Sequence, residues 1–362
     1  MAVLTRFKPL FVAPLLVACG GSHEKPEKPA ARLSPAPTAV ANTDPSFAGP
    51  VLTTEAITLE PGGERLLVCQ SFPLHNDDWL FVEGVTFNAT GVHHSNWFVT
   101  PEDAYPGPPG AADCSESGVG VFSNEAPTSG GLMFSQSPEA ANETQAFAEG
   151  AAIAVAPHSK VMVSYHVLNT SPQPLDVGMS AALRMLPESD VKVRLRSGGG
   201  QIGLLAVPPM ERSRFYSDCT FADPPTFKAY FMLPHYHQRG VGMRLELLGG
   251  ARDGEVVWQN EGAIGEALGT QIAPAADFTG ATGFRFSCLY ENTTARTIQS
   301  GSSFDDEMCT FFLSTDASRE FYGIAAPGFG SPTIVDQGMG AEGEHLFAVD
   351  GCAVLMGAEA GN

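Results

Sequence analysis

Residues 85–99, VTFNATGVHHSNWFV, carry the pattern that decides the fold. Two runs rich in β-branched and aromatic residues, 85–90 and 94–99, are separated by a short break that contains Gly91. Runs of this kind, interrupted every eight to twelve residues or so by Gly, Pro, Asn or Asp, are typical of antiparallel β-sandwiches. Further runs along the chain are AAIAVA (151–156), VMVSYHV (161–167), VKVRL (191–195), KAYFML (228–233), MRLEL (243–247), EVVW (255–258), FRFSCLY (284–290) and CTFFL (309–313). The sequence therefore predicts an all-β protein with antiparallel sheets.

The length of 362 residues exceeds that of an ordinary single domain and predicts two domains of similar size. Hydrophobic residues make up 43% of the chain, which is enough to fill two cores. The glycine-rich stretch 197–200 is expected to be a turn at the boundary, so the domains are predicted at 51–197 and 198–357. Convincing helical periodicity is scarce, and the Ala-rich stretch 138–152 is the segment where a helix is considered.

The chain is acidic, and its charge excludes some classes of binding partner. It has 20 Lys and Arg residues against 40 Asp and Glu residues, a formal net charge of −20. Such a charge repels phosphate backbones and anionic headgroups. We therefore expect no nucleic-acid partner, and any membrane contact must come from a covalent anchor.

The N-terminal sequence has the features of an export signal. Arg6 and Lys8 precede the apolar run 9–18, which is too short to span a bilayer. The sequence Leu-Val-Ala-Cys at 16–19 resembles a bacterial lipobox, in which the cysteine is lipidated. We expect a signal peptide at 1–18, a lipidated Cys19 and a Pro/Ala-rich tether at 19–50. The lipid on Cys19 would anchor the protein in the outer membrane of a Gram-negative bacterium. The alternative is an ordinary cleaved signal.

Six cysteines remain once Cys19 is set aside: Cys69, Cys114, Cys219, Cys288, Cys309 and Cys352. In an oxidising compartment the expectation is three disulfides. Pairing within the predicted domains gives Cys69–Cys114 and leaves three options for the other four cysteines. Buried free thiols are the alternative.

Five of the nine histidines fall into tight sets: His93-His94, His166 and His235-Tyr236-His237. Residues two apart on a strand face the same side, so His235 and His237 can direct both imidazoles at one point. Adjacent His93 and His94 need a bulge or turn to do the same, and Gly91 permits one. Each set alone has an ordinary explanation, a surface pair or a hydrogen-bonded core histidine. The remaining histidines are expected to be structural or exposed.

Met308 favours a metal site over the ordinary roles of these histidines. In isolation it is a core residue at the start of a strand. Together with His235 and His237 it would provide two imidazole nitrogens and one thioether sulfur, a ligand set that favours Cu(I) over zinc or iron.

The ordered motifs resemble those of the type II copper, ascorbate-dependent monooxygenases, the family of the peptidylglycine α-hydroxylating and dopamine β-monooxygenases. The matching segments, spread over most of 51–355, are Gly91-Val92-His93-His94, His166 with Asn169, Pro234-His235-Tyr236-His237 with Gly240, Cys288-Leu289-Tyr290-Glu291-Asn292-Thr293, and Asp306-Glu307-Met308-Cys309.

The resemblance implies two tandem jelly-roll β-sandwich domains that each carry one copper ion across an open cleft. It implies that His93, His94 and His166 hold the first copper, which supplies an electron. It implies that His235, His237 and Met308 hold the second, the catalytic copper, where O2 is activated and a substrate C–H bond is attacked. Ascorbate or another reductant would be the electron donor. The chain would act as a monomer on a small-molecule substrate.

The resemblance also selects among the disulfide pairings. It implies Cys69–Cys114, Cys219–Cys352 and Cys288–Cys309, the last of which would hold Met308 beside its metal.

Three positions depart from the peptide-amidating members, where an Arg, an Asn and a Tyr anchor a terminal carboxylate. Here the matching positions are Leu233, Thr310 and Phe312. With the cationic partner missing, we expect an uncharged or apolar substrate. The alternative hypotheses are a non-catalytic surface lipoprotein that binds or buffers copper, and a purely structural double sandwich.

Overall fold

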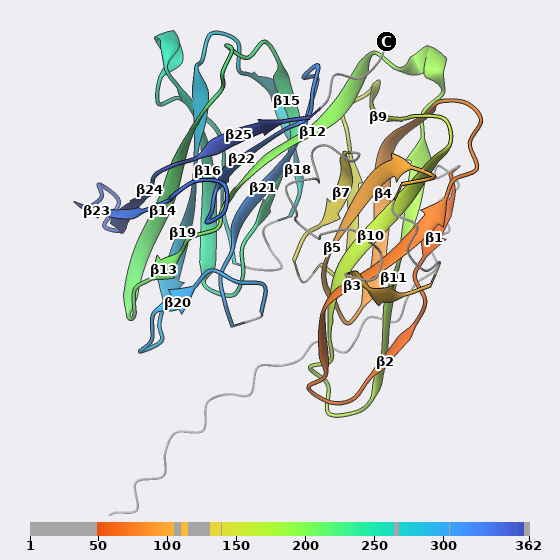
Figure 1. The fold of residues 1–362 in the computed structure, drawn as a ribbon, viewed down its shortest axis with the longest axis horizontal. Coiled ribbons are helices and arrows are strands. Elements are labelled where there is room, and N and C mark those ends of the chain that lie inside the picture. The colour runs from red at the N-terminus through yellow and green to blue at the C-terminus, as the bar shows by residue number, and fades with distance from the viewer. Residues whose placement is uncertain are drawn as a thin grey trace, which may run out of the picture. The chain divides into compact units, whose positions relative to one another are not determined.

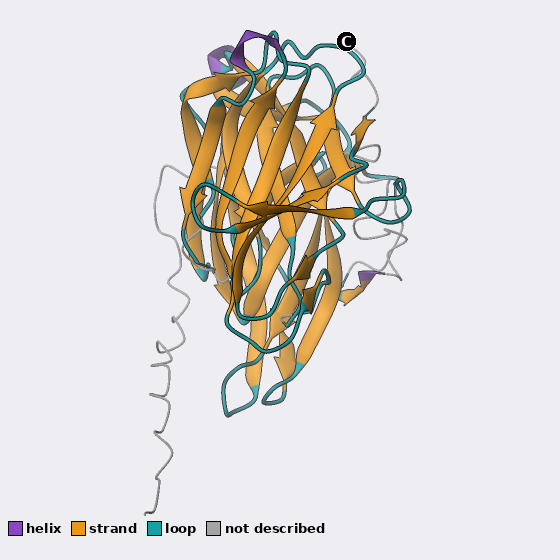
Figure 2. Cartoon of the chain, turned by 90° about the vertical axis from the view of Figure 1, so that its left-hand side faces the viewer, coloured by secondary structure: helices purple, strands orange, loops and turns teal. Residues whose placement is uncertain are grey.

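The computed structural model describes residues 49–104, 110–114, 131–138, 140–263, 268–303 and 305–357. The predicted signal peptide 1–18, Cys19 and all of the tether up to residue 48 lie outside these residues. Within them, regular structure is strand apart from short 3₁₀ turns, which include η2 at Glu188–Asp190 and η3 at Gly250–Arg252 (Figure 2). A search of the same residues finds no helix that is both long and apolar enough to span a membrane.

The first half of the described chain forms a β-sandwich (Figure 1, orange to green). Its strands are β1 (Val51–Thr53), β2 (Ile57–Leu59), β3 (Glu64–Pro73), β4 (Leu80–Thr90), β5 (Val92–Pro101), β6 (Ala112–Asp113), β7 (Leu132–Gln136), β8 (Asn142–Ala146), β9 (Ala151–Val155), β10 (Ser159–Leu168) and β11 (Leu175–Met185). Strands β1 and β2 pair with β11, which pairs with β4, which pairs with β8 and β9; the facing sheet has the order β6-β3-β10-β5-β7. The chain alternates between the sheets, and β10 and β11 return between earlier strands. This is jelly-roll wiring.

The second half repeats this wiring (Figure 1, green to blue). Its strands are β12 (Val193–Ile202), β13 (Ala206–Val207), β14 (Glu211–Thr220), β15 (Lys228–His235), β16 (Gly240–Leu248), β17 (Val256–Glu261), β18 (Thr270–Asp277), β19 (Gly283–Asn292), β20 (Ile298–Gln299), β21 (Cys309–Thr315), β22 (Phe321–Ala325), β23 (Ile334–Met339), β24 (His345–Val349) and β25 (Ala353–Met356). The sheets run β12-β21-β15-β18 and β17-β16-β19-β14, with β22 added beside β12 and β24 beside β14. Thus β14, β15, β16, β19 and β21 correspond to β3, β4, β5, β10 and β11. The predicted all-β fold of two antiparallel jelly rolls is confirmed.

The two jelly rolls share a strand and part of a core. Strand β12 pairs with β9 over 193–195 and with β21 over 196–202. Two clusters of buried apolar side chains lie in the described chain, and Phe231 and Leu233 of β15 pack into the cluster formed by the first jelly roll. Side chains of β15 therefore fill a core that belongs largely to the other sandwich.

Two expectations about local structure are wrong. The stretch 197–200 lies inside β12 and is not a turn. Its glycines serve close packing, because a Cβ on Gly198 would lie 2.5 Å from the ring of Phe321 and one on Gly200 would lie 2.6 Å from the ring of Phe311. The stretch 138–152 contains strand β8 and the start of β9 instead of a helix. Burial alternates along β8, which is the strand period of two.

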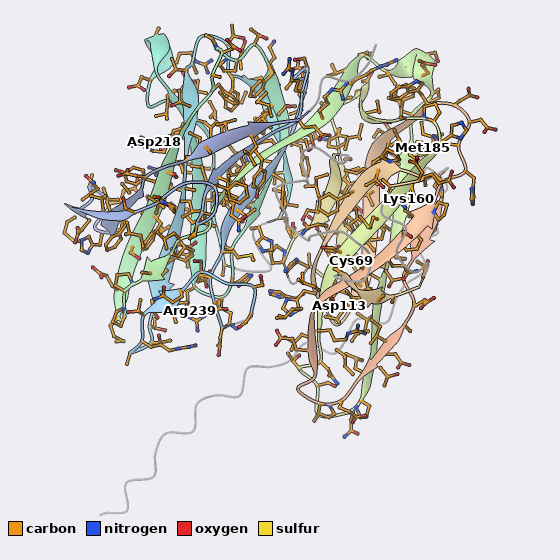
Figure 3. All side chains as sticks on the ribbon, viewed as in Figure 1. Cys69, Asp113, Lys160, Met185, Asp218 and Arg239 are labelled. Atoms are coloured by element: carbon orange, nitrogen blue, oxygen red, sulfur yellow. A yellow bond between two sulfur atoms is a disulfide. The ribbon has the colours of Figure 1, made fainter. Side chains whose placement is uncertain are left out.

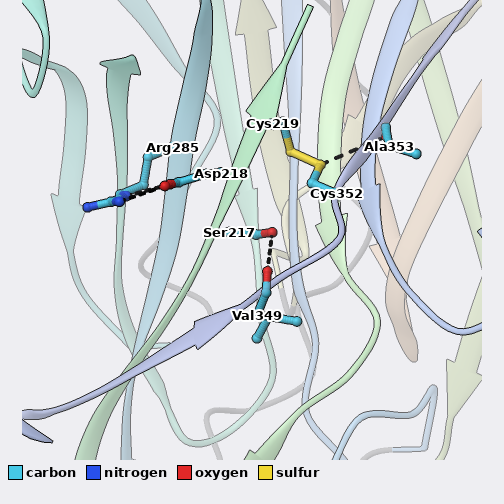
Figure 4. The surroundings of a disulfide bond; sticks show 7 residues. All are labelled: Ser217, Asp218, Cys219, Arg285, Val349, Cys352 and Ala353. Carbon is cyan, nitrogen blue, oxygen red and sulfur yellow. Dashed lines mark hydrogen bonds and ion pairs between the residues drawn. A yellow bond between two sulfur atoms is a disulfide. The ribbon is translucent and has the colours of Figure 1, made fainter. Parts of the chain in front are cut away.

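Three disulfides close the sandwiches, with the pairings that the resemblance implied. Cys69 on β3 (labelled in Figure 3) bonds Cys114, with 4.8 Å between the Cα atoms. Cys219–Cys352 joins β14 to the segment before β25, and in the same region Ser217 donates a hydrogen bond to the carbonyl of Val349 (Figure 4). Cys288–Cys309 joins β19 to β21.

Candidate metal-binding site

His93 and His94 lie at the start of β5, just after the turn from β4. Gly91 in that turn has a φ of 62°, which glycine adopts without strain. In the pairing of β5 with β10, His94 lies opposite His166 but the next pair is Val92 with Val167, so His93 is the extra residue of a bulge. A bulge lets neighbouring side chains approach the same side of a strand. The bulge expected from the adjacent histidines is confirmed, and all three histidine side chains are buried.

His235 and His237 lie at the corresponding place in the second jelly roll, the end of β15 and its turn to β16. His235 pairs with Thr310 of β21, and Tyr236 between the two histidines is buried in the core of this jelly roll. The carboxylate of Glu307 accepts hydrogen bonds from the backbone N–H of His237 at 2.9 Å and of Arg239 at 2.7 Å (Arg239 is labelled in Figure 3). Glu307 thus fixes the turn that presents His237.

The two histidine sets form one cluster. The ring centroids of His94 and His235 are 4.7 Å apart, and those of His93 and His237 are 5.5 Å apart. The distance from His93 to His166 is 4.9 Å, so contacts between the sets are as short as those within them. The resemblance implied two sets separated by a cleft, whereas all five imidazoles lie together in this structure.

Three imidazoles of this cluster, those of His94, His235 and His237, favour the neutral form. Burial lowers the pKa of His94 and of His235 well below the ordinary value, and neighbouring imidazoles lower both further. Burial also lowers the pKa of His237 to about 4. A neutral imidazole is the form that binds a metal.

Several buried nitrogen atoms of the cluster have no hydrogen-bond partner among the described residues. These atoms are Nδ1 of His94, both ring nitrogens of His235 and Nε2 of His237. Leaving a buried polar atom unsatisfied costs roughly 1–3 kcal/mol. A metal ion would satisfy these lone pairs, so the donor set fits a cation that prefers nitrogen ligands, such as copper or zinc.

Two further contacts orient the histidines as they are oriented in metal sites. Nε2 of His166 lies 2.8 Å from Oε1 of Glu64, and a carboxylate only accepts, so Nε2–H is the donor and Nδ1 carries the lone pair. Nδ1–H of His237 donates in the same way to the carbonyl of Asp306 at 3.1 Å. Such outer partners fix the tautomer and aim of metal-binding histidines. Sequence reasoning missed Glu64, which nothing in the linear pattern marks.

Met308 directly follows Glu307, the residue that binds the backbone of His237, and precedes β21. Its side chain is buried, and its carbonyl accepts a hydrogen bond of 2.6 Å from the hydroxyl of Tyr290. The disulfide of Cys309 adds a covalent restraint at the next residue. These contacts hold Met308 at the start of the strand that pairs with the His235 strand.

A small apolar pocket lies along the same face of β15. Its volume is about 20 Å³, close to the space for one water molecule. Leu233 and Phe312, two of the predicted substrate-pocket residues, line it. Thr310, the third, is buried opposite His235. Leu233 and His235 are two residues apart on β15 and so share a face, which places the pocket next to the cluster.

Sequence reasoning also missed Tyr322. Its ring centroid lies 6.5 Å from that of Phe312, and its hydroxyl is buried. Gly199 lies between these rings on β12, and a Cβ there would lie 3.0 Å from the ring of Tyr322. Burial raises the pKa of Tyr322 well above its ordinary value, and the Thr310 hydroxyl opposes this shift.

Comparison with known proteins adds little to this geometry. No family model and no curated protein matches the chain. Among solved structures, the chain is similar to one described under the triple jelly-roll fold and turret assembly of an archaeal virus, at 8% identity and a TM-score of 0.19. The match covers 75% of this chain and 59% of the viral chain. A similarity this remote carries no functional argument.

Proposed function

We propose that this protein is a copper-dependent monooxygenase that hydroxylates a C–H bond of an uncharged or apolar small molecule with O2 and an external reductant such as ascorbate. The observation that carries the proposal is the cluster of five buried imidazoles, in which His94, His235 and His237 direct unsatisfied nitrogens inward. Copper bound there would supply one-electron redox chemistry towards O2.

The proposed roles follow the motif positions of the resemblance. With two ions per chain, His93, His94 and His166 would hold the electron-supplying copper. His235, His237 and Met308 would hold the catalytic copper. The protein itself contributes orientation: Glu64 holds the His166 ring, and the buried carboxylate of Glu307 holds the turn of His237.

The substrate proposal rests on the pocket beside His235. Among the described residues that line it, none is charged, and Leu233, Phe312 and Phe231 contribute large apolar surfaces. A pocket of this kind offers no cationic partner to a carboxylate. The pocket must widen to admit more than a water molecule.

That small volume is the observation that favours the second candidate function, a copper-binding or copper-buffering protein with no substrate. Its donor set would be the same. The N-terminal motif supports the same location for both candidates, export and attachment to the outer membrane through a lipid on Cys19, with the chain acting as a monomer.

Oxygen uptake separates the two candidates. Purified protein loaded with copper and ascorbate is given an alkylbenzene or its carboxylated analogue, and O2 consumption and hydroxylated product are measured. The monooxygenase proposal expects product and extra O2 uptake with the hydrocarbon, at least tenfold less with the carboxylate, and neither with His235→Ala. Copper binding with no substrate-dependent uptake across a panel of apolar compounds would reject it and leave the buffering function.

A further inference from the structure

We infer that a single metal ion is held jointly by the two jelly rolls, by His93 and His94 of β5 and His237 of the turn after β15. This inference rests on the proposed metal-binding function but departs from its assignment of ligands, which keeps the two histidine sets apart. It concerns the protein with one ion per chain.

The first support is geometric. One ring nitrogen from each of His93, His94 and His237 can be chosen so that all three atoms lie within 4.8 Å of one another. Nitrogen ligands at about 2.0–2.1 Å from a tetrahedral ion lie about 3.4 Å apart. Binding one ion therefore requires any two of these nitrogens to approach each other by about 1.4 Å at most.

The second support is the direction of the lone pairs. His237 uses Nδ1–H on the carbonyl of Asp306, which leaves Nε2 as the donor atom towards the cluster. That atom and Nδ1 of His94 are both buried and lack hydrogen-bond partners in the described chain. One nitrogen from each jelly roll is thus available for the same cation.

The third support is the position of His93 and His94 between the other rings. His93 contacts the rings of His166 and His237, and His94 contacts those of His166 and His235. An ion at this centre uses the nitrogens that face the other jelly roll, while His166 keeps its hydrogen bond to Glu64. His93 and His94 are also ligands in the two-ion assignment, so we expect a second ion to compete for them and to bind with lower affinity.

The experiment measures Cu(I) affinity of the full chain at half an equivalent of metal, by anaerobic competition with a chromophoric Cu(I) chelator. Four single alanine variants are compared with wild type, at His94, His166, His235 and His237. The control is His75→Asn, which changes an exposed histidine outside the cluster and keeps a residue that tolerates its φ of 50°. The thermal unfolding of each variant shows that it is folded.

The shared site expects His94→Ala and His237→Ala each to weaken the first equivalent at least tenfold, while His166→Ala, His235→Ala and His75→Asn change it less than threefold. The two variants that weaken binding, at His94 and His237, then lie in different jelly rolls. If His94→Ala and His166→Ala weaken the first equivalent equally, or His237→Ala and His235→Ala do so, the shared site is overturned. Two separate copper sites then remain. If wild type binds no Cu(I), the proposed function fails as well.

Discussion

A single hydrogen bond between Glu64 and His166 shows how much of this site depends on residues outside the ligand set. The distance of 2.8 Å joins a partly exposed carboxylate on β3 to an imidazole that is 1% exposed on β10. Since the carboxylate only accepts, it selects the tautomer with the proton on Nε2. We expect its effect to be on the proposed metal affinity more than on stability, because a partly exposed pair contributes little to folding.

Removal of this partner gives the first prediction. Glu64→Ala frees the His166 ring to change tautomer and orientation, and we expect the affinity for the second equivalent of copper to fall about 10–100-fold. Glu64→Gln is the matched control, because its amide oxygen still accepts from Nε2–H. Chelator competition at two equivalents measures both variants. Equal losses in the two variants would show that the charge matters and not the hydrogen bond.

Glu320 gives a prediction about pH. It is half-buried on the strand edge before β22, close to Gly131, and burial raises its pKa to about 7 while Arg196 opposes the shift. A carboxyl with a raised pKa binds its proton more tightly in the folded state, so stability falls as pH rises from about 4.5 to about 7 and is then level.

Glu320→Gln removes this dependence. We expect the variant to be more stable than wild type at pH 8, by on the order of 2 kcal/mol, and the difference to shrink towards pH 4.5. Urea unfolding of both proteins at the two pH values measures it. A difference that stays constant over this range would mean that the carboxyl does not titrate as described.

At the level of strands, the sequence predicts where strands lie better than how they pack against one another. The β-branched and aromatic runs do form strands, because alternation and breaker residues act locally. The prediction of a turn at the glycines of β12 is wrong, because these glycines make room for the ring of Phe321 on one strand and of Phe311 on another. Such long-range contacts leave no mark in a linear pattern.

For the histidine motifs too, the sequence predicts local structure but not long-range contacts. The bulge at His93 was predictable, since adjacent ligands require one. The contact of His94 with His235 was not, because it joins β5 to β15 and depends on how the sandwiches pack. The spacing of the motifs therefore identifies the candidate ligands without saying which of them meet.

At the scale of the whole molecule, the shared core predicts cooperative unfolding. Phe231 belongs to β15, is 5% exposed and packs edge-to-face on Phe147, with 5.7 Å between ring centroids. Phe147 lies beyond β8 in the first jelly roll and stacks on Phe134 of β7. Damage to β15 must therefore reach both cores.

Phe231→Ala should lower the free energy of unfolding by about 3–5 kcal/mol. Because Phe231 lies on a strand of the second jelly roll and packs into the core of the first, we expect calorimetry to show one transition that moves as a whole to lower temperature. Phe278→Ala, in the core of the second jelly roll alone, provides the comparison. Two resolved transitions, of which Phe231→Ala moves just one, would contradict the shared core.

The matching wiring of the two jelly rolls has a consequence for the ancestry of the chain. The histidine pairs lie at corresponding places in the two halves, just after the turn from β4 to β5 and at the end of β15 with its turn to β16. The third candidate ligands do not correspond, because His166 lies on β10, the counterpart of β19, whereas Met308 leads into β21, the counterpart of β11. Duplication of one gene segment that encoded a sandwich with histidines beside this turn would produce such an arrangement. The paired histidines would then be inherited, whereas His166 and Met308 would each have been acquired after the two copies diverged.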